Sequence, residues 1–343
     1  SYINAKIRAR KSGLLTNEQW DALLGARDMI AALRILDMTG YSDLIKEFDS
    51  QVLPIEVEKT LQTHFGEVLI EITNDVPGSV QHLMNLISKM FQKEVVKTLL
   101  RLYTSESDQA TAKRLLVPMS PFTLEILLDL VAASDIHVLI SKLPDKFFRS
   151  ILEEKLPKYE ESRKLIVLEQ ALDKVVLQNL YGQCQRLNGL DKQTTTNLVG
   201  LEIDLVNLMI ILRSQFLGIP SPEAGLLLLE PGYKLPCSLC RSAMQHETLE
   251  QRIRVLKESW YGSLVNQGWE AYEQSKSLHV FERIFHKHIQ AVSQDMMLGY
   301  PFHFGVVLGY LNLKWYETLN LKALLNGKAE NIESSIIRRT LIQ

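Results

Sequence analysis

Apolar residues recur at helical spacing along most of the chain. In 158–187 they fall at i, i+3, i+4 and i+7, and charged side chains occupy the rest of the helical wheel. The segments 80–103, 192–217, 269–294 and 303–326 follow the same rule. Strict alternation of apolar and polar residues is rare, and no Asn-Gly or Asp-Gly turn joins alternating segments. The pattern predicts an all-α protein.

One apolar pattern occurs three times, at 26–45, 133–152 and 246–265. The copies keep register at offsets of 107 and then 113 residues. The same offsets relate three further sets of apolar residues: Leu61, Leu168 and Phe281; Phe65, Leu172 and Phe285; Leu69, Val176 and Ile289. Several separate blocks in one register indicate a module that was copied twice.

The repeat predicts three similar helical domains, 1–117, 118–230 and 231–343, with pseudo-threefold symmetry. Each copy is expected to be a cluster of short helices followed by two long antiparallel helices. In the first copy the long pair is expected at 54–75 and 80–103. A tripled module is typical of scaffolds, adaptors and rings, whereas a catalytic centre is seldom tripled within one chain.

Composition narrows the class further. The 343 residues are 46% hydrophobic and 23% charged, with a formal net charge of −2, which gives no general attraction to nucleic acid or to an acidic membrane surface. Three cysteines argue against a disulfide framework and favour a reducing compartment. The amino end is too polar for a signal peptide. The most apolar run, 198–212, contains two acids, so we expect no membrane span and a membrane connection only through a protein partner.

Motifs for enzymatic chemistry are missing from the sequence. It contains no G-x-x-x-x-G-K-[ST], G-x-G-x-x-G, H-E-x-x-H or G-x-S-x-G. Cys237 and Cys240 form a lone C-x-x-C without the second pair that structural zinc needs, so they are interpreted as one face of a helix. We therefore predict no catalytic residues and no bound metal, nucleotide or other cofactor.

The amino-terminal segment carries a basic run on an expected amphipathic helix. Its members are Lys6, Arg8, Arg10 and Lys11. One interpretation is a basic helix face that is simply solvated. The other is a surface that contacts lipid headgroups or an acidic partner.

Two acid–amide pairs occupy equivalent places under the repeat: Asp204 with Asn207, and Glu317 with Asn320. Residues at i and i+3 share a helix face. In the first copy these places hold Gln92 and Val95, so the polar pair is lost there. Either the side chains bind loop backbone within each module, or they line a central opening and contact a partner.

The sequence resembles the C subunit of archaeal and bacterial A/V-type ATPases, a relative of the d subunit of eukaryotic V-ATPases. Three blocks carry the resemblance: the amino end at 2–15, the block at 202–213 with Pro231-Gly232 after it, and the carboxyl end at 317–328 with 336–341. Each block is moderately specific. Their order, their spacing and the threefold offset together cover essentially the whole chain.

The resemblance implies an all-α funnel of three similar domains. It also implies a non-catalytic central-stalk adaptor, which seats the central shaft of a rotary motor on the membrane rotor ring for ion transport or ATP synthesis. The implied partners are the central-shaft subunits and the rotor-ring subunits, without nucleic acid. The implied location is cytoplasmic, peripheral to the membrane through the complex.

Two other functions are weighed against the adaptor. A helical-repeat scaffold for soluble cytosolic partners fits the same pattern, and co-purification with ATPase stalk and ring subunits would distinguish the two. An enzyme built on the acid–amide pairs has little support, because such a pair lacks a nucleophile or metal beside it.

Overall fold

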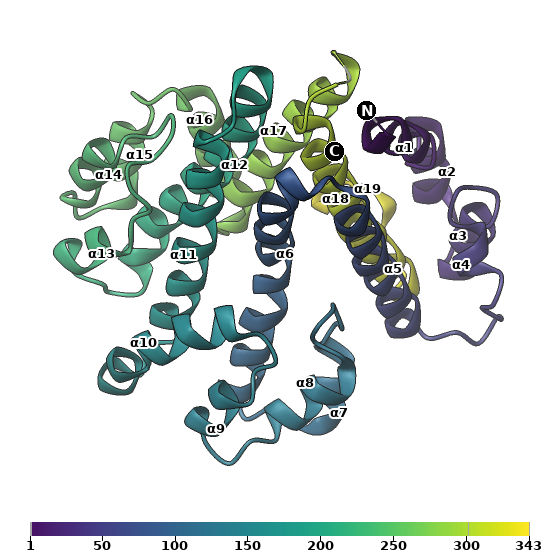
Figure 1. Ribbon diagram of the computed structural model, residues 1–343, viewed down its shortest axis with the longest axis horizontal. Coiled ribbons are helices and arrows are strands. Elements are labelled where there is room, and N and C mark those ends of the chain that lie inside the picture. Colours follow the sequence, from purple (N-terminus) through teal and green to yellow (C-terminus); the bar gives the residue numbers. More distant parts are fainter. Residues whose placement is uncertain (1, 301, 343) are drawn as a thin grey trace. The chain divides into compact units, whose positions relative to one another are not determined.

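The computed structural model describes residues 2–300 and 302–342, and their secondary structure is helical (Figure 1). The only β-type pairing in those residues is an isolated bridge between Met119 and Phe122. The predicted all-α class is therefore confirmed.

The helices of the first third of the chain are α1 (Tyr2–Lys11), α2 (Asn17–Gly25), α3 (Met29–Leu36), α4 (Ser42–Ile45), α5 (Pro54–Asp75), α6 (Gly78–Thr104) and α7 (Gln109–Leu115). Those of the middle third are α8 (Leu124–Val131), α9 (Ile136–Ser141), α10 (Lys146–Ser162), α11 (Ile166–Gln185), α12 (Gly189–Phe216) and α13 (Ser221–Leu227). Those of the last third are α14 (Cys237–Met244), α15 (Leu249–Leu256), α16 (Gly262–Ser275), α17 (His279–Leu298), α18 (Gly305–Ala329) and α19 (Ser334–Thr340).

The order of the helices repeats with the spacing found in the sequence. Helices α3, α9 and α15 begin at Met29, Ile136 and Leu249, which are 107 and then 113 residues apart. Short side chains that cap their first turns recur at the same spacing, because Asp28, Asp135 and Thr248 each accept a hydrogen bond from a backbone N–H three residues later. Local capping therefore fixes the start of the same helix in each copy. The division into three similar domains remains a prediction.

Two periodic segments that predict single helices are interrupted. Segment 158–187 is divided between α10 and α11, and segment 269–294 between α16 and α17. The breaks follow Arg163 and Lys276, which both have φ of 55°. Each donates its backbone N–H to the carbonyl four residues earlier, at 2.7 Å, which is a left-handed helix cap. The two caps lie 113 residues apart, so the interruption itself belongs to the repeat.

Contacts divide the chain into two compact units. The first unit contains 1–145 and 293–343, and the second contains 146–292. In the first unit, α18 packs against α5, α1, α3 and α19, so the end of the chain lies against its beginning (Figure 1). In the second unit, α11 packs against α10 and α12, and α12 packs against α14, α13 and α15.

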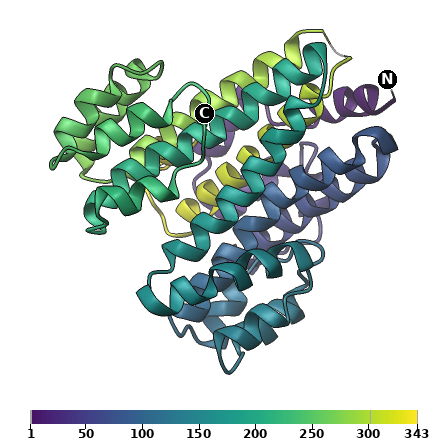
Figure 2. The same ribbon diagram turned by 60° about the vertical axis from the view of Figure 1, so that its left-hand side comes forward.

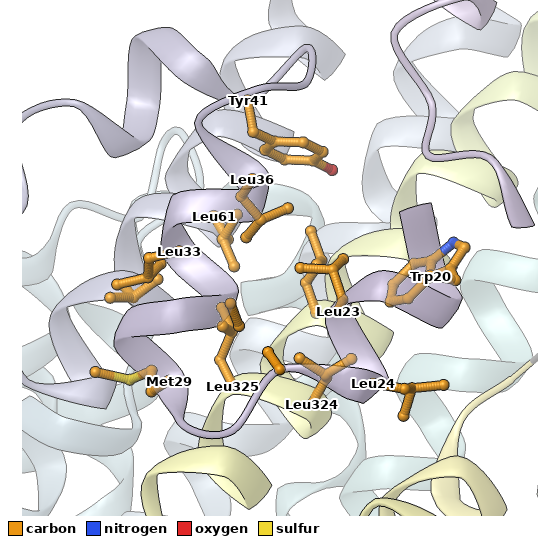
Figure 3. Packing of buried hydrophobic residues seen from close by; sticks show 14 of the residues in the cluster. Trp20, Leu23, Leu24, Met29, Leu33, Leu36, Tyr41, Leu61, Leu324 and Leu325 are labelled. Atoms are coloured by element: carbon orange, nitrogen blue, oxygen red, sulfur yellow. The ribbon is translucent and has the colours of Figure 1, made fainter. Parts of the chain in front are cut away.

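The core of the first unit joins residues from both ends of the sequence. Side chains of α2 and α3, including Trp20 and Leu36, converge with Leu61 of α5 and with Leu324 and Leu325 of α18 (Figure 3). At roughly 25 cal/mol per Å² of buried apolar area, each of these large side chains contributes about 1.5–3 kcal/mol to the fold. The short-helix cluster of the first copy is thus completed by the last long helix.

Helix α12 is the one described helix that is long and apolar enough to cross a membrane. Its best 18-residue window has a mean hydropathy of 1.5, but 78% of that window is buried within the protein. A core helix passes the same test of length and composition.

Candidate functional site

Asp204 of α12 is a fully buried acid that ties two later segments together. Its carboxylate accepts hydrogen bonds from the backbone N–H groups of Tyr233 (2.8 Å), Lys234 (2.6 Å) and Leu235 (3.0 Å), and from the hydroxyl of Tyr261 (2.6 Å). One side chain therefore holds the loop that enters α14 and the turn that precedes α16.

Glu317 of α18 makes the corresponding tie in the first unit. Its carboxylate accepts from the hydroxyl of Tyr41 (2.6 Å) and from the backbone N–H of Leu15 (2.7 Å). The Lys314 Nζ atom lies 3.3 Å from the same carboxylate and donates to the Tyr41 hydroxyl at 2.8 Å. All three side chains are buried. Their hydrogen bonds join the last long helix to the first short-helix cluster.

The position in the first copy that is equivalent to Asp204 and Glu317 lacks an acid–tyrosine hydrogen bond. Gln92 replaces the acid and donates its side-chain amide to the carbonyl of Ser120 at 2.6 Å. Phe148, which has no hydroxyl, stands where the other copies have tyrosine. Acid and tyrosine have thus changed together, which is the sequence signal that would have found the pair.

Asn207 and Asn320 each clamp one backbone position 22 residues later. Asn207 donates to the Leu229 carbonyl at 3.0 Å and accepts from the Leu229 N–H at 2.8 Å. Asn320 makes both bonds to Ile342, each at 2.7 Å. The amide side chain satisfies a donor and an acceptor that would otherwise be left unpaired. Both asparagines therefore bind loop backbone, as one of the two interpretations from sequence expects.

Burial is the main cause of the pKa shifts of the side chains that make these hydrogen bonds. Burial raises the pKa of Asp204 above its usual range, and the four donors to its carboxylate oppose the shift. Burial raises the pKa of Tyr261 and Tyr41, and the neighbouring carboxylate raises each further. Burial lowers the pKa of Lys314, against the effect of Glu317. Both tyrosines therefore remain hydrogen-bond donors at neutral pH.

The arrangement suits mechanical ties better than bond-making chemistry. The oxygens of Asp204 and Glu317 are occupied by donors from the protein itself, so they are not presented to a substrate. Among residues 2–300 and 302–342, no group of three or more His, Cys, Asp or Glu side chains is placed to hold a metal ion. Cys237 and Cys240 are buried free thiols on α14.

Two members of the basic run are paired with acids of α5. Lys6 lies 2.5 Å from Asp75, and Arg10 forms an ion pair with Glu71. The hydrogen bond that Lys6 donates to Asp75 is the largest cause that raises the pKa of Lys6. These two cations hold α1 against the first long helix, a role that the sequence interpretation did not include.

The other two basic residues, Arg8 and Lys11, are held less closely by the rest of the protein. Arg8 is exposed, and Lys11 donates to the carbonyl of Met297 at 3.5 Å. Lys11 therefore lies beside the end of α17, in the same unit as α1. The basic run is divided between internal pairing and an exposed cationic surface.

Lys328 and Arg252 are further buried cations that the sequence interpretation missed. Lys328 donates to the carbonyls of Leu24 and Ala26, both at 2.6 Å, and to Ser334 Oγ at 2.8 Å. It neutralises the carbonyl end of α2, where a cation is favoured. A lysine among the buried positions of α18 was the available signal.

Arg252 likewise donates hydrogen bonds to backbone carbonyls in the second unit. Its guanidinium donates to the carbonyls of Ile211 (2.7 Å) and His246 (3.0 Å) and to Ser214 Oγ (2.9 Å). Helix α15 is thereby bonded to the end of α12. A single buried arginine joins segments that are distant in sequence.

Comparison with known proteins gives one consistent result. Residues 3–340 match the model of a family described as ATP synthase (C/AC39) subunit. The C subunit of the A-type ATP synthase of Methanocaldococcus jannaschii is 26% identical over 343 residues, which is 100% of this chain and 86% of the relative. The same subunit of Methanosphaera stadtmanae is 25% identical, over 100% of this chain and 87% of the relative. That of Halobacterium salinarum is 23% identical, over 99% and 97%.

Proposed function

Because the chain belongs to the ATP synthase (C/AC39) subunit family, we propose that it is a central-stalk adaptor, which joins the central shaft of a rotary ATPase to its membrane rotor ring. The chain is a non-catalytic subunit of a membrane-associated ATP synthase complex. The proposal adds the position within the complex: cytoplasmic, peripheral, and between shaft and ring.

The observation that carries the proposal is the extent of the family match. It spans 338 of the 343 residues, from 3 to 340. An additional catalytic domain would leave part of the chain unmatched. The resemblance of both ends and the middle block to the C subunit of A/V-type motors supports the role that we propose within the motor.

The internal ties suit a part that transmits torque. Such a part must resist twisting, and a helix bonded only to its sequence neighbours can slide. The ties of Asp204 and Glu317 instead bond a long helix to a short-helix cluster that comes later or much earlier in the chain. A buried hydrogen bond to a charged group contributes about 1.5–3 kcal/mol. In the proposed funnel, these hydrogen bonds would join the second domain to the third through Asp204, and the third domain to the first through Glu317.

Pseudo-threefold symmetry would explain how the shaft is held. Three similar modules, 1–117, 118–230 and 231–343, arranged around one axis would leave a central space for the tip of the shaft. The recurrence of α3, α9 and α15 at the sequence offsets supports this arrangement. The shaft interface would bury apolar area, whereas contacts with the polar loops of the ring would depend on charge and weaken with salt.

The basic helix α1 is the part of the chain that we assign to a partner. Arg8 is exposed and Lys11 is half-buried, so both can reach a partner, while Lys6 and Arg10 position the helix through Asp75 and Glu71. Asp204, Asn207, Glu317 and Asn320 would act on partners only indirectly, since each is buried and bonded within its own unit.

Co-purification tests the assignment to the stalk. The tagged chain is expected to bring down the shaft and ring subunits together, and Arg8→Glu is expected to weaken capture more at low salt than at high salt. Arg254→Glu, an exposed charge reversal on α15, serves as the matched control. A chain that captures other soluble proteins, and neither shaft nor ring, would identify the helical-repeat scaffold instead.

A further inference from the structure

The turn between α17 and α18 exposes three large apolar side chains. Leu298, Tyr300 and Phe302 are 74%, 62% and 59% exposed. The rings of Tyr300 and Phe302 pack edge to face with centroids 5.6 Å apart, so they form one aromatic knob. An exposed cluster of this kind marks a contact site more often than a single exposed leucine does.

The other two long helix pairs do not share this feature. Their turns lie at 76–77, between α5 and α6, and at 186–188, between α11 and α12. The first contains Val76, which is buried, and neither contains an aromatic residue. The aromatic knob is therefore specific to the third copy and is not required for joining two long helices.

Cationic side chains accompany the knob. Helix α1 lies beside this turn in both ribbon views (Figures 1 and 2), and Lys11 donates to Met297 immediately before it. Arg8, one turn earlier on α1, is exposed. Asp295 is an exposed acid on the last turns of α17, so the local charge is mixed with a cationic excess on α1.

The small exposed area of the knob favours a lipid surface over a protein partner. Given 150–250 Å² for a fully buried aromatic side chain, the three residues expose roughly 350 Å². A stable protein interface buries about 800 Å² on each partner and needs a complementary surface. A small cluster of exposed side chains can enter the soft boundary between headgroups and acyl chains without a complementary surface, and tyrosine is enriched at that depth.

We propose that the α17–α18 turn is a membrane-interface anchor: Leu298, Tyr300 and Phe302 enter the boundary region of an anionic bilayer, and Lys11 and Arg8 face its headgroups. The inference deepens the proposed function and rests on it for the setting, since an adaptor seated on a membrane ring lies close to lipid. The anchor would hold the adaptor to the bilayer beside its protein contacts.

Vesicle flotation of the full-length chain tests the anchor. The wild-type chain is expected to float with vesicles of phosphatidylcholine and phosphatidylglycerol. The double variant Tyr300→Ser/Phe302→Ser is expected to bind about tenfold more weakly, because most of the inserted apolar area is removed. Met38→Ser/Leu53→Ser removes two similarly exposed apolar side chains elsewhere in the same unit and is expected to bind like wild type.

The charge contribution is tested by vesicle composition. Binding is expected to fall several-fold when phosphatidylglycerol is omitted or salt is raised, and Arg8→Glu is expected to reproduce that loss. Equal vesicle binding by wild type and the knob variant would overturn the anchor, and so would a knob variant that loses only its affinity for the detergent-solubilised ring. A chain that binds vesicles through the knob but joins neither shaft nor ring would contradict the proposed function alone.

Discussion

The hydroxyl of Tyr41 donates to the carboxylate of Glu317 at 2.6 Å, across 276 residues of sequence. The bond joins the first short-helix cluster to the last long helix, next to Lys314. The same relationship recurs between Tyr261 and Asp204. A bond repeated at the offset of the sequence repeat is what the predicted module would produce, and the one at Tyr41 joins the two ends of the chain within the first unit.

Removal of this hydroxyl is expected to destabilise the chain. Tyr41→Phe should lower the free energy of unfolding by about 2 kcal/mol, since a buried carboxylate and lysine lose a partner. Glu317→Gln should cost a similar amount. The double variant should cost less than the sum of the two single variants, because both substitutions disrupt the same hydrogen bond. Urea unfolding measures all three, with the exposed Tyr300→Phe as control; strict additivity would show that the two residues are not coupled.

The carboxyl-terminal clamp is expected to control the end of the chain. Asn320→Ala leaves the N–H and carbonyl of Ile342 without their partner and should cost about 1–3 kcal/mol. The segment after α18 should then be cut sooner in limited proteolysis. Asn85→Ala, at an exposed site on α6, should leave the cleavage rate unchanged. An equal cleavage rate in both variants would argue against the clamp.

Two helical glycines should respond in opposite directions to the same substitution. A Cβ atom at Gly268 of α16 would lie 2.3 Å from the ring of Phe281, so Gly268→Ala should destabilise the chain by about 1–3 kcal/mol. At Gly182 of α11 no atom lies within 4 Å of the added Cβ, so Gly182→Ala should stabilise by about 0.5–1 kcal/mol. Thermal unfolding of the pair measures both, and an unchanged or raised stability of Gly268→Ala would contradict the close approach of α16 and α17.

Acid is expected to weaken the first unit through His64. Burial and then the charge of Lys314 lower the pKa of His64 to about 4, from 6.5 in the unfolded chain. Between these values the unfolded state binds more protons, so stability falls as pH falls from 6.5 toward 4. With a discount for partial exposure, the loss is about 2 kcal/mol.

His64→Gln should remove this part of the pH dependence while leaving the carboxylate contributions in place. Urea unfolding of both proteins at about pH 7, 6, 5 and 4, which spans the titration, isolates the histidine. Parallel curves for the two proteins would contradict the depressed pKa.

Local signals in the sequence predicted the helices well, and distant pairings much less. Apolar periodicity placed α5 and α6 within a few residues, because a buried stripe needs only the spacing of its own helix. The same signal missed the breaks after Arg163 and Lys276, since a left-handed cap interrupts the backbone without disturbing the apolar pattern.

The repeat also identified Asp204 and Glu317 as special, but not their partners. Which tyrosine each acid binds depends on how the chain closes on itself, and periodicity carries no information about that. The parallel change to Gln92 and Phe148 was the only available hint. Lys328 likewise binds the carbonyls of Leu24 and Ala26, and the spacing of residues along α18 does not reveal these partners.

The coupling of ATP hydrolysis to ion transport tests the central claim most directly. The measurement compares the intact complex with one assembled without this chain, and records ATP hydrolysis and ion uptake into vesicles in parallel. If the chain is the adaptor, its loss is expected to abolish transport and to leave hydrolysis by the catalytic head largely intact. Loss of ATP hydrolysis in the complex that lacks this chain, with shaft and ring still joined, would contradict an adaptor.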